Sequence, residues 1–309
     1  MTKKRIGVLV MSYGTPESLD QIEAYYTHIR RGSPPTPEQL HDLKSRYEAI
    51  VGGFFPLREN TNKQLKSLQD TLNREHPEHE FICYHGLKHA APFIEDGVAG
   101  MVEDGITEAI GVVLAPHYST MSVGSYVKRA KEKAEETGLN MEFVMSYHLH
   151  PKLLEALTLR VRKALTLFAD ARPVEVKVIF TAHSLPEKIL EMKDPYPDQL
   201  LATASAVAER ASITNWMFGW QSAGRTAAPW LGPDILDVLR QIHDDEHVKH
   251  VLVCPIGFVS DHLEVLYDID IECKHLAKQL GMHLERTESL NTDPLYMETL
   301  SDVVFEKVK

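Results

Sequence analysis

Short apolar runs alternate along the chain with longer segments in which apolar residues recur at helical spacing. The runs that predict strands are residues 5–11, 80–85, 108–114, 141–145, 175–181, 214–219, 248–254 and 282–286. Several are almost continuously apolar, as in Val251-Leu252-Val253, which is typical of strands covered on both faces. Helices are predicted over residues 17–30, 36–50, 60–75, 91–104, 122–137, 151–169, 197–211, 233–243, 261–280 and 294–308. This alternation indicates an α/β fold with parallel sheets and right-handed crossovers.

Four predicted strands fall in each half of the chain. We therefore expect two similar Rossmann-like lobes, each a four-stranded parallel sheet flanked by helices, over residues 1–150 and 151–309. The sequence leaves open whether the last helix, residues 294–308, packs on the second lobe or returns to the first.

Two strand ends repeat each other, which supports an internal duplication. Residues 6–16 and 176–186 both read as an apolar strand, a polar step, a ring residue and a proline, so that Tyr13 and His183 occupy the same place. Residues 109–118 and 250–258 form a second similar pair. Ligands in open α/β sheets bind outside the carboxyl ends of the strands. We expect the ligand site in a cleft between the lobes, with Tyr13 opposite His183.

Composition narrows the classes of partner. The chain has 309 residues and a net charge of −11, which argues against nucleic acid or an anionic membrane as the main ligand, because such sites need a basic field. Its three cysteines are scattered, so the spacing supports neither a zinc knot nor a cysteine-bound cluster. Few cysteines fit a reducing compartment, and we expect a cytoplasmic protein.

Other common signals are missing from the sequence. The apolar stretch of residues 6–11 is too short for a signal peptide, and the chain lacks a run of about 18 apolar residues that could span a membrane. The dinucleotide motif GxGxxG, the phosphate loop GxxxxGK[ST] and the nucleophile elbow GxSxG are absent. With these motifs absent, the remaining candidates for chemistry are histidines and carboxylates.

Three carboxylates, Glu264, Asp268 and Glu272, are spaced i, i+4 and i+8 on one predicted helix and would share one stripe of its surface. A solvated acidic face is one interpretation. The alternative is a partly buried row that conducts cations or protons, which the apolar neighbours Leu263 and Ile269 favour.

His183 directly follows a predicted strand, where it is either a structural residue or a group that faces a ligand. Imidazole and carboxylate together suit a divalent metal such as Fe²⁺, so His183 with Glu264 could deliver a metal or accept protons. Both roles need an unprotonated imidazole.

Several side chains suit a flat ligand that carries carboxylates. Arg30-Arg31 and Arg46-Tyr47 flank a proline-rich turn in a chain of negative charge. These arginines are either surface charge or a site for a carboxylate-bearing ligand, which a guanidinium group can hold through two parallel hydrogen bonds. Trp220 and Trp230 lie in segments rich in glycine and proline, where they either plug the core or form the wall of an aromatic ligand's site.

Ordered motifs along nearly the whole chain resemble those of the ferrochelatases, most of all the soluble monomeric enzymes of Gram-positive bacteria. They are MSYGTP at 11–16, YYTHIRRG at 25–32, GLKH at 86–89, LAPHYS at 114–119, AHSLP at 182–186, DPYP at 194–197, GWQS at 219–222 and GFVSDHLEVLYD at 257–268. The resemblance implies insertion of Fe²⁺ into a porphyrin in heme biosynthesis, with coproporphyrin III as the expected substrate and coproheme as the product. It implies a monomer that needs no cofactor, because Fe²⁺ is a substrate.

The resemblance also implies roles for residues at matching positions. His183 and Glu264 would deliver the metal and accept protons, while Asp268 and Glu272 would continue the acidic line as an outer divalent-metal site, for example for Mg²⁺, with Arg46 nearby. The residues expected to hold the porphyrin and its propionates are Tyr13, Arg30, Arg31, Tyr47, Lys88, Tyr126 and Trp230. The C-terminal cysteine cluster of some relatives is absent, so no iron–sulfur centre is expected.

Two positions depart from the family pattern. The pattern near Gly52-Gly53 continues with one residue and then Ser-Pro, whereas this chain has Phe54-Phe55-Pro56, and Lys193 stands where the family favours Gly or Asn. The departures leave room for altered porphyrin choice or a divergent copy of low activity, and four alternatives to the main expectation stay open at this point. They are protoporphyrin IX as substrate, a heme or porphyrin carrier or low-activity paralogue, a cobalt or nickel chelatase for another tetrapyrrole, and a two-lobed sugar- or amino-acid-binding protein.

Overall fold

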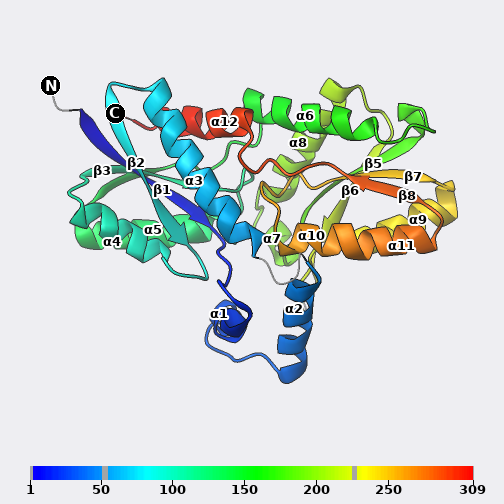
Figure 1. The fold of residues 1–309 in the computed structure, drawn as a ribbon, viewed down its shortest axis with the longest axis horizontal. Helices are drawn as coiled ribbons and strands as arrows, with labels where there is room; N and C mark the ends of the chain where they lie inside the picture. Colours follow the sequence, from blue (N-terminus) through cyan, green and yellow to red (C-terminus); the bar gives the residue numbers. More distant parts are fainter. Residues whose placement is uncertain (1–2, 51–54, 225–227, 309) are drawn as a thin grey trace. The chain divides into compact units, whose positions relative to one another are not determined.

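The computed structural model describes residues 3–50, 55–224 and 228–308. Within them lie eight strands: β1 (Lys4–Ser12), β2 (His79–Leu87), β3 (Glu108–Val113), β4 (Asn140–Phe143), β5 (Val176–His183), β6 (Trp216–Gln221), β7 (His250–Cys254) and β8 (His283–Arg286). Each matches a strand predicted from the sequence, with ends that agree to within two residues. They form two parallel sheets, ordered β2-β1-β3-β4 and β6-β5-β7-β8 (Figure 1).

The two sheets have the same topology, as internal duplication predicts. β1 lies between β2 and β3 in the first sheet, and β5 lies between β6 and β7 in the second. These central strands are the two that carry the repeated sequence, and both are buried along most of their length. Their continuous burial follows from helices covering both faces, as expected for parallel sheets.

The helices fill the connections between strands. They are α1 (Ile22–Ile29), α2 (Pro37–Ala49), α3 (Pro56–Glu75), α4 (Ile94–Glu103), α5 (Val123–Thr137), α6 (Pro151–Leu165), α7 (Lys188–Glu191), α8 (Tyr196–Ala211), α9 (Ile235–Glu246), α10 (Leu263–Leu266), α11 (Lys274–Gln279) and α12 (Pro294–Phe305). Two 3₁₀ turns, η1 (Leu19–Gln21) and η2 (Pro173–Glu175), and a π-helical segment, η3 (Asp268–Cys273), complete the set. No helix among the described residues is long and apolar enough to cross a bilayer.

Two differences from the predicted helices matter for the site. The short helix α7 was not predicted, because four residues carry too little periodicity to be recognised. The helix predicted over residues 261–280 is a succession of α10, η3 and α11, so its middle is π-helical rather than α-helical.

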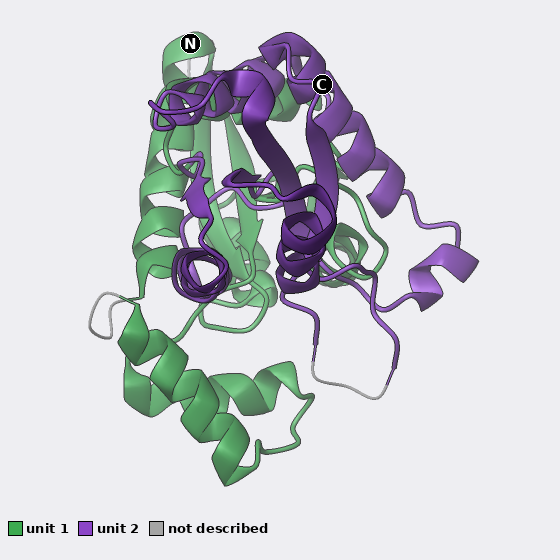
Figure 2. Cartoon of the chain, turned by 90° about the vertical axis from the view of Figure 1, so that its right-hand side faces the viewer, with its two compact units in different colours: residues 1–147, 291–309 green, residues 148–290 purple. Residues whose placement is uncertain are grey.

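The chain divides into two compact units (Figure 2), residues 1–147 with 291–309 and residues 148–290, here called the N-terminal unit and the C-terminal unit. The last helix, whose placement the sequence left open, belongs to the N-terminal unit, where α12 packs on α3. The Ser301 hydroxyl donates to Glu75 at 2.7 Å, and the Phe305 ring stacks on His76 with centroids 3.5 Å apart.

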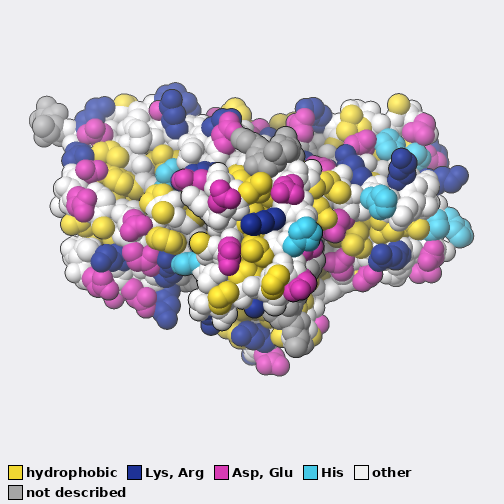
Figure 3. Space-filling model, turned by 60° about the horizontal axis from the view of Figure 1, so that its bottom comes forward, with side chains coloured by type: hydrophobic (Ala, Val, Ile, Leu, Met, Phe, Trp, Pro, Cys, Tyr) yellow, Lys and Arg dark blue, Asp and Glu magenta, His cyan; other side chains and the backbone are white. Residues whose placement is uncertain are grey.

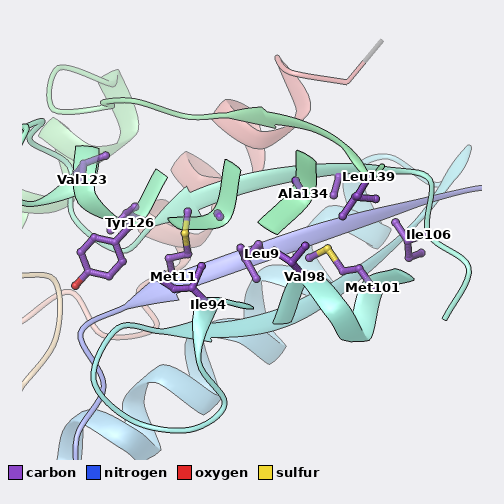
Figure 4. Close-up of a cluster of buried hydrophobic side chains, with 13 residues drawn as sticks. Leu9, Met11, Ile94, Val98, Met101, Ile106, Val123, Tyr126, Ala134 and Leu139 are labelled. Carbon is purple, nitrogen blue, oxygen red and sulfur yellow. The ribbon is translucent and has the colours of Figure 1, made fainter. Parts of the chain in front are cut away.

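Each unit has its own core. In the N-terminal unit, Leu9 and Met11 of β1 pack against Val98 and Met101 of α4 and against the buried face of α5 (Figure 4). In the C-terminal unit, Ile179 and Val253 pack against α9 and against Ile269 and Cys273 of η3. The π-helical segment is therefore anchored by its apolar side chains, which fixes the direction in which its acidic side chains point.

Candidate active site

His183 is the last residue of β5 and pairs with Gln221 at the end of β6. Its backbone is held firmly, because the Tyr196 hydroxyl donates to the His183 carbonyl at 3.1 Å and the buried Ser184 hydroxyl donates to Leu231 O at 2.7 Å. Nδ1 of His183 contacts the Ser184 carbonyl. When Nδ1 carries a proton and donates it to this carbonyl, the other ring nitrogen, Nε2, faces the carboxylate of Glu264.

Glu264, in α10, lies between two imidazoles. Its Oε1 is 3.6 Å from Nε2 of His183, and its Oε2 is 3.6 Å from Nε2 of His262. The Gln221 side chain links the elements, since Nε2 donates to the Glu264 carbonyl at 3.0 Å while Oε1 accepts from Thr181 at 2.7 Å. The sequence predicts the His183–Glu264 pair, and it does not predict the second imidazole.

His262 was missed because residues two apart do not share a helix face. Its backbone is extended rather than helical, with φ of −158°, and its Nδ1 lies 2.9 Å from the Ser260 carbonyl. Because His262 is extended and directly precedes the first turn of α10, its ring points toward Glu264. A histidine two residues before a candidate carboxylate, at the start of a predicted helix, is the signal that could have indicated it.

The charges of this cluster are strongly coupled. Burial opposes the imidazolium of His183, but the Glu264 carboxylate, the contact with Ser184 and the charge of Asp268 outweigh it and raise the pKa of His183 to about 9. Burial likewise opposes the carboxylate of Glu264, yet His183 and His262 hold its pKa well below the usual range. In the free protein near neutral pH, His183 and Glu264 therefore form an imidazolium–carboxylate pair. Either role foreseen for His183 begins with loss of that proton.

The acidic row continues from Glu264 into the π-helical segment. The Asp268 carboxylate is buried and accepts a hydrogen bond from the Ser222 hydroxyl. The N–H of Glu272 donates to the Tyr267 carbonyl at 3.0 Å. A hydrogen bond between residues five apart is characteristic of a π-helix. The assumption of one regular α-helical stripe is therefore wrong. Asp268 is buried, and Glu264 and Glu272 are partly buried, which favours a partly buried row over a solvated acidic face.

Aromatic side chains surround His183 within the C-terminal unit. The ring centroids of Trp230 and of Phe258 both lie 6.4 Å from that of His183. Trp220 is different, because it is buried between Tyr196 and Phe218 and plugs the core. Of the two tryptophans considered from the sequence, only Trp230 lies beside the candidate catalytic pair.

In the N-terminal unit, three of the predicted porphyrin-holding residues gather at the carboxyl end of the sheet. Tyr13 is exposed directly after β1, and its ring lies 4.6 Å from that of His89. Nζ of Lys88 donates to the Ser125 hydroxyl at 2.7 Å and lies 4.8 Å from the Tyr126 ring. The N–H of Lys88 donates to the Ser12 carbonyl at 2.9 Å, so β1 and the segment after β2 are tied together here.

The remaining predicted residues of the N-terminal unit lie in or beside α1 and α2. Arg31 is exposed, with φ of 56°, whereas Arg30 is half-buried and donates from Nε to Ser33 O at 3.2 Å. Arg46 is half-buried in α2 and forms an ion pair with Asp42 at 3.2 Å. Tyr47 is buried, and its hydroxyl is 3.1 Å from the Thr15 hydroxyl. Tyr47 thus contributes packing in this unit, which sequence spacing could not reveal.

A family model described as ferrochelatase matches residues 5–308. This chain belongs to the ferrochelatase family. It is 48% identical over 309 residues to a coproporphyrin III ferrochelatase of Geobacillus thermodenitrificans, covering 100% of this chain and 98% of that protein. It is also 48% identical over 309 residues to a coproporphyrin III ferrochelatase of Bacillus subtilis, covering 100% of this chain and 99% of that protein.

Solved structures agree on the fold. SirB from Bacillus subtilis, determined with Fe³⁺, superimposes with a TM-score of 0.63 over 98% of this ferrochelatase-family chain and 95% of its own, at 12% identity. CbiX, described as the terminal enzyme of siroheme biosynthesis in denitrifying bacteria, gives a TM-score of 0.56 at 10% identity, covering 99% of this chain and 100% of its own. At such identities the likeness concerns the fold alone.

The two departures from the ferrochelatase pattern have physical explanations. Phe55 is buried and packs on Tyr47 with ring centroids 4.7 Å apart, so the bulky ring fills the interior of the N-terminal unit. Its neighbours Gly52, Gly53 and Phe54 lie outside the described residues. Lys193 has φ of 52°, a left-handed conformation that Gly and Asn adopt at lower cost. The family preference for those residues therefore reflects the backbone, and the exposed Lys193 is the costlier choice.

Proposed function

We propose that this chain inserts Fe²⁺ into coproporphyrin III and releases coproheme and two protons. The observation that carries the proposal is the His183–Glu264–His262 cluster at the end of β5. It occurs in a chain 48% identical, from end to end, to coproporphyrin III ferrochelatases. The enzyme is a metal chelatase, and iron is its substrate.

The chemistry requires two things of the protein. The two pyrrole N–H protons must leave as Fe²⁺ binds the ring nitrogens, and the iron must approach through groups that hold it weakly enough to release it. Once His183 has lost its own proton, its Nε2 can accept a pyrrole proton or bind the arriving iron. The Glu264 carboxylate stabilises the imidazolium that forms when His183 accepts a proton, and the same attraction holds the pKa of Glu264 low while His183 is charged.

The acidic row supplies a route away from this pair. Asp268 and Glu272 follow Glu264 at intervals of four residues, and neither side chain is exposed. Partly buried oxygen ligands attract divalent cations and pass protons. We propose that the row carries iron inward or protons outward, and that Asp268 and Glu272 can also hold an outer divalent ion such as Mg²⁺. We further propose that Arg46 supports the binding of the outer ion. The reaction requires no further cofactor.

Cationic and aromatic side chains would hold the porphyrin. Lys88, Arg30 and Arg31 would bind propionates, Tyr13 and Tyr126 would contact the macrocycle, and Trp230 would form part of the wall beside His183. Coproporphyrin III carries more propionates than protoporphyrin IX, so a cationic set of this kind favours the former. On the face shown in Figure 3, Lys and Arg side chains are interspersed with Asp and Glu and do not form one basic field. We propose that the chain acts without nucleic acid, as a monomer.

The three cysteines support a cytoplasmic location. Cys83, Cys254 and Cys273 all lie within the described residues, and all are buried and free. Reduced thiols persist in the reducing interior of a cell. We therefore place the enzyme in the cytoplasm.

Substrate choice is tested by anaerobic Fe²⁺ insertion into coproporphyrin III and protoporphyrin IX, measured side by side through loss of porphyrin fluorescence. We expect rapid turnover of coproporphyrin III and at least about tenfold slower turnover of protoporphyrin IX, corresponding to about 1.4 kcal/mol of lost transition-state stabilisation. Faster insertion into protoporphyrin IX would reverse the assignment. Tight binding of coproheme without turnover of either porphyrin would favour a carrier.

Porphyrin affinity is expected to depend on pH through Lys88. Burial, Arg129 and Arg31 lower the pKa of Lys88 to about 8 in the free protein. A bound propionate favours the ammonium, so coproporphyrin affinity should fall as the pH rises above 8, by at most about tenfold per pH unit for one linked proton. The measurement is fluorescence titration from pH 7 to 10.

The matched control is Lys88→Arg, whose guanidinium keeps its charge throughout this range. This variant should lose most of the decline in affinity above pH 8. An equal decline in wild type and Lys88→Arg would show that Lys88 does not hold a propionate.

A further inference from the structure

A second group of metal-binding side chains lies at the other end of the C-terminal sheet. His250 begins β7 and His283 begins β8, and the two residues pair directly across the parallel strands. Asp170 lies in the connection between α6 and β5. One ligand atom from each of these three residues lies within 4.8 Å of the other two. The fold thus brings together one carboxylate and two imidazoles from three separate segments.

Both imidazole rings lie beside a buried aromatic side chain. The buried Phe168 ring lies 4.8 Å from the His283 ring and 5.9 Å from the His250 ring, measured between centroids. Nε2 of His283 is 3.0 Å from Oε1 of Glu285, a contact that orients the imidazole. Carboxylates that bind the remote nitrogen of a metal-ligating histidine commonly play this orienting role.

One ring nitrogen of this group is unsatisfied. Nδ1 of His250 is buried and has no hydrogen-bond partner among the described residues. A buried polar atom without a partner is destabilising, so such atoms call for an explanation. A ring whose nitrogen is not engaged by protein can turn toward a ligand without breaking a hydrogen bond.

We propose that Asp170, His250 and His283 bind a divalent transition-metal ion of the zinc and ferrous-iron class. Two imidazoles and one carboxylate are typical ligands for these ions, whereas Mg²⁺ and Ca²⁺ prefer oxygen alone. Zinc ligands lie about 2.0–2.2 Å from the ion, so side-chain rotations that shorten the present separations would complete the site. Asp170 and His283 are exposed, which leaves the remaining coordination positions to water.

This site is separate from the candidate active site. His250 pairs with Val176 at the start of β5, seven residues before His183 at the end of that strand. At about 3.3 Å per residue, the two sites are roughly 23 Å apart along the sheet. Metal bound here would join the Asp170 segment to β7 and β8, and would stabilise the folded C-terminal unit rather than take part in insertion.

The test is equilibrium dialysis of the full-length protein against buffered Zn²⁺, comparing wild type with Asp170→Asn and His283→Ala. We expect both variants to bind one equivalent fewer than wild type, whatever number of ions binds near Glu264. We also expect Zn²⁺ to raise the Tm of wild type more than that of Asp170→Asn. Asp170→Asn removes a ligand oxygen's charge from an exposed position and should leave the fold intact, as circular dichroism would verify.

The control is His243→Ala, which removes an exposed histidine that contacts Asp244 at 2.8 Å on α9 in the same unit. His243→Ala should keep the full number of zinc ions and the full rise in Tm. Equal zinc stoichiometry in wild type, Asp170→Asn and His283→Ala would overturn the proposal. The rate of iron insertion by Asp170→Asn should equal that of wild type. A failure of the metal-site proposal can therefore be distinguished from a failure of the proposed function.

Discussion

Replacing His183 with alanine is expected to lower the rate of iron insertion by about 10²–10⁴-fold, the range typical of a lost general acid–base group. The alanine has no nitrogen to accept a pyrrole proton or to bind iron, and the variant keeps only the Glu264 carboxylate and the His262 imidazole of this cluster. Anaerobic insertion of Fe²⁺ into coproporphyrin III, followed by fluorescence, measures the loss.

The fold should survive this substitution. The His183 side chain is partly exposed, and Glu264 retains its second partner, His262. His243→Ala again serves as the control, with unchanged turnover expected. Wild-type turnover in a correctly folded His183→Ala enzyme would show that the assigned site is wrong.

Gly97→Ala is expected to destabilise the N-terminal unit by about 3 kcal/mol or more. A Cβ built on Gly97 in α4 would lie 2.2 Å from the His85 carbonyl oxygen and 2.6 Å from Cδ1 of Leu9. The carbonyl belongs to β2 and the leucine to the buried core, so neither atom can move without shifting the sheet or its packing. Forcing an extra methyl group into a packed core commonly costs about 1–3 kcal/mol, and a backbone clash places this case at or above the upper end. Urea denaturation would measure the change in free energy of unfolding.

Gly100→Ala, one turn further along the same helix, is the matched control. Its Cβ would meet nothing closer than the Tyr84 ring, at 3.8 Å. Since alanine is a better helix former than glycine by about 0.8–1.0 kcal/mol, this variant should be slightly more stable than wild type. Similar effects of the two substitutions would contradict the packing described for α4.

Strands β1, β3, β5 and β7 were predictable from sequence because they are buried along most of their length and read as apolar runs, whereas β4 and β8 are only partly buried. The repeated motif before Tyr13 and His183 predicted the internal duplication, and the structure adds that its two copies form the central strands β1 and β5. The π-helical segment was not predictable, because apolar spacing over the six residues of η3 distinguishes poorly between α- and π-helical turns.

Pairings between segments were the least predictable features. The sequence indicated that His183 and Glu264 act together, but the contact of His262 with Glu264 depends on an extended residue before α10. Strands starting near His250 and His283 were predicted, whereas their register, which places these imidazoles side by side, was not. The burial of Tyr47 likewise depends on Phe55 and Thr15, distant positions that local patterns do not connect.

The most direct test of the account follows coproporphyrin III binding and iron insertion together, in wild type and His183→Ala, under anaerobic conditions. Binding is read from the porphyrin absorbance shift, and insertion from the loss of fluorescence after Fe²⁺ is added. The account predicts that both proteins bind the porphyrin and that only wild type inserts iron rapidly. Porphyrin binding by both proteins with no insertion by either would contradict it and identify the chain as a porphyrin carrier.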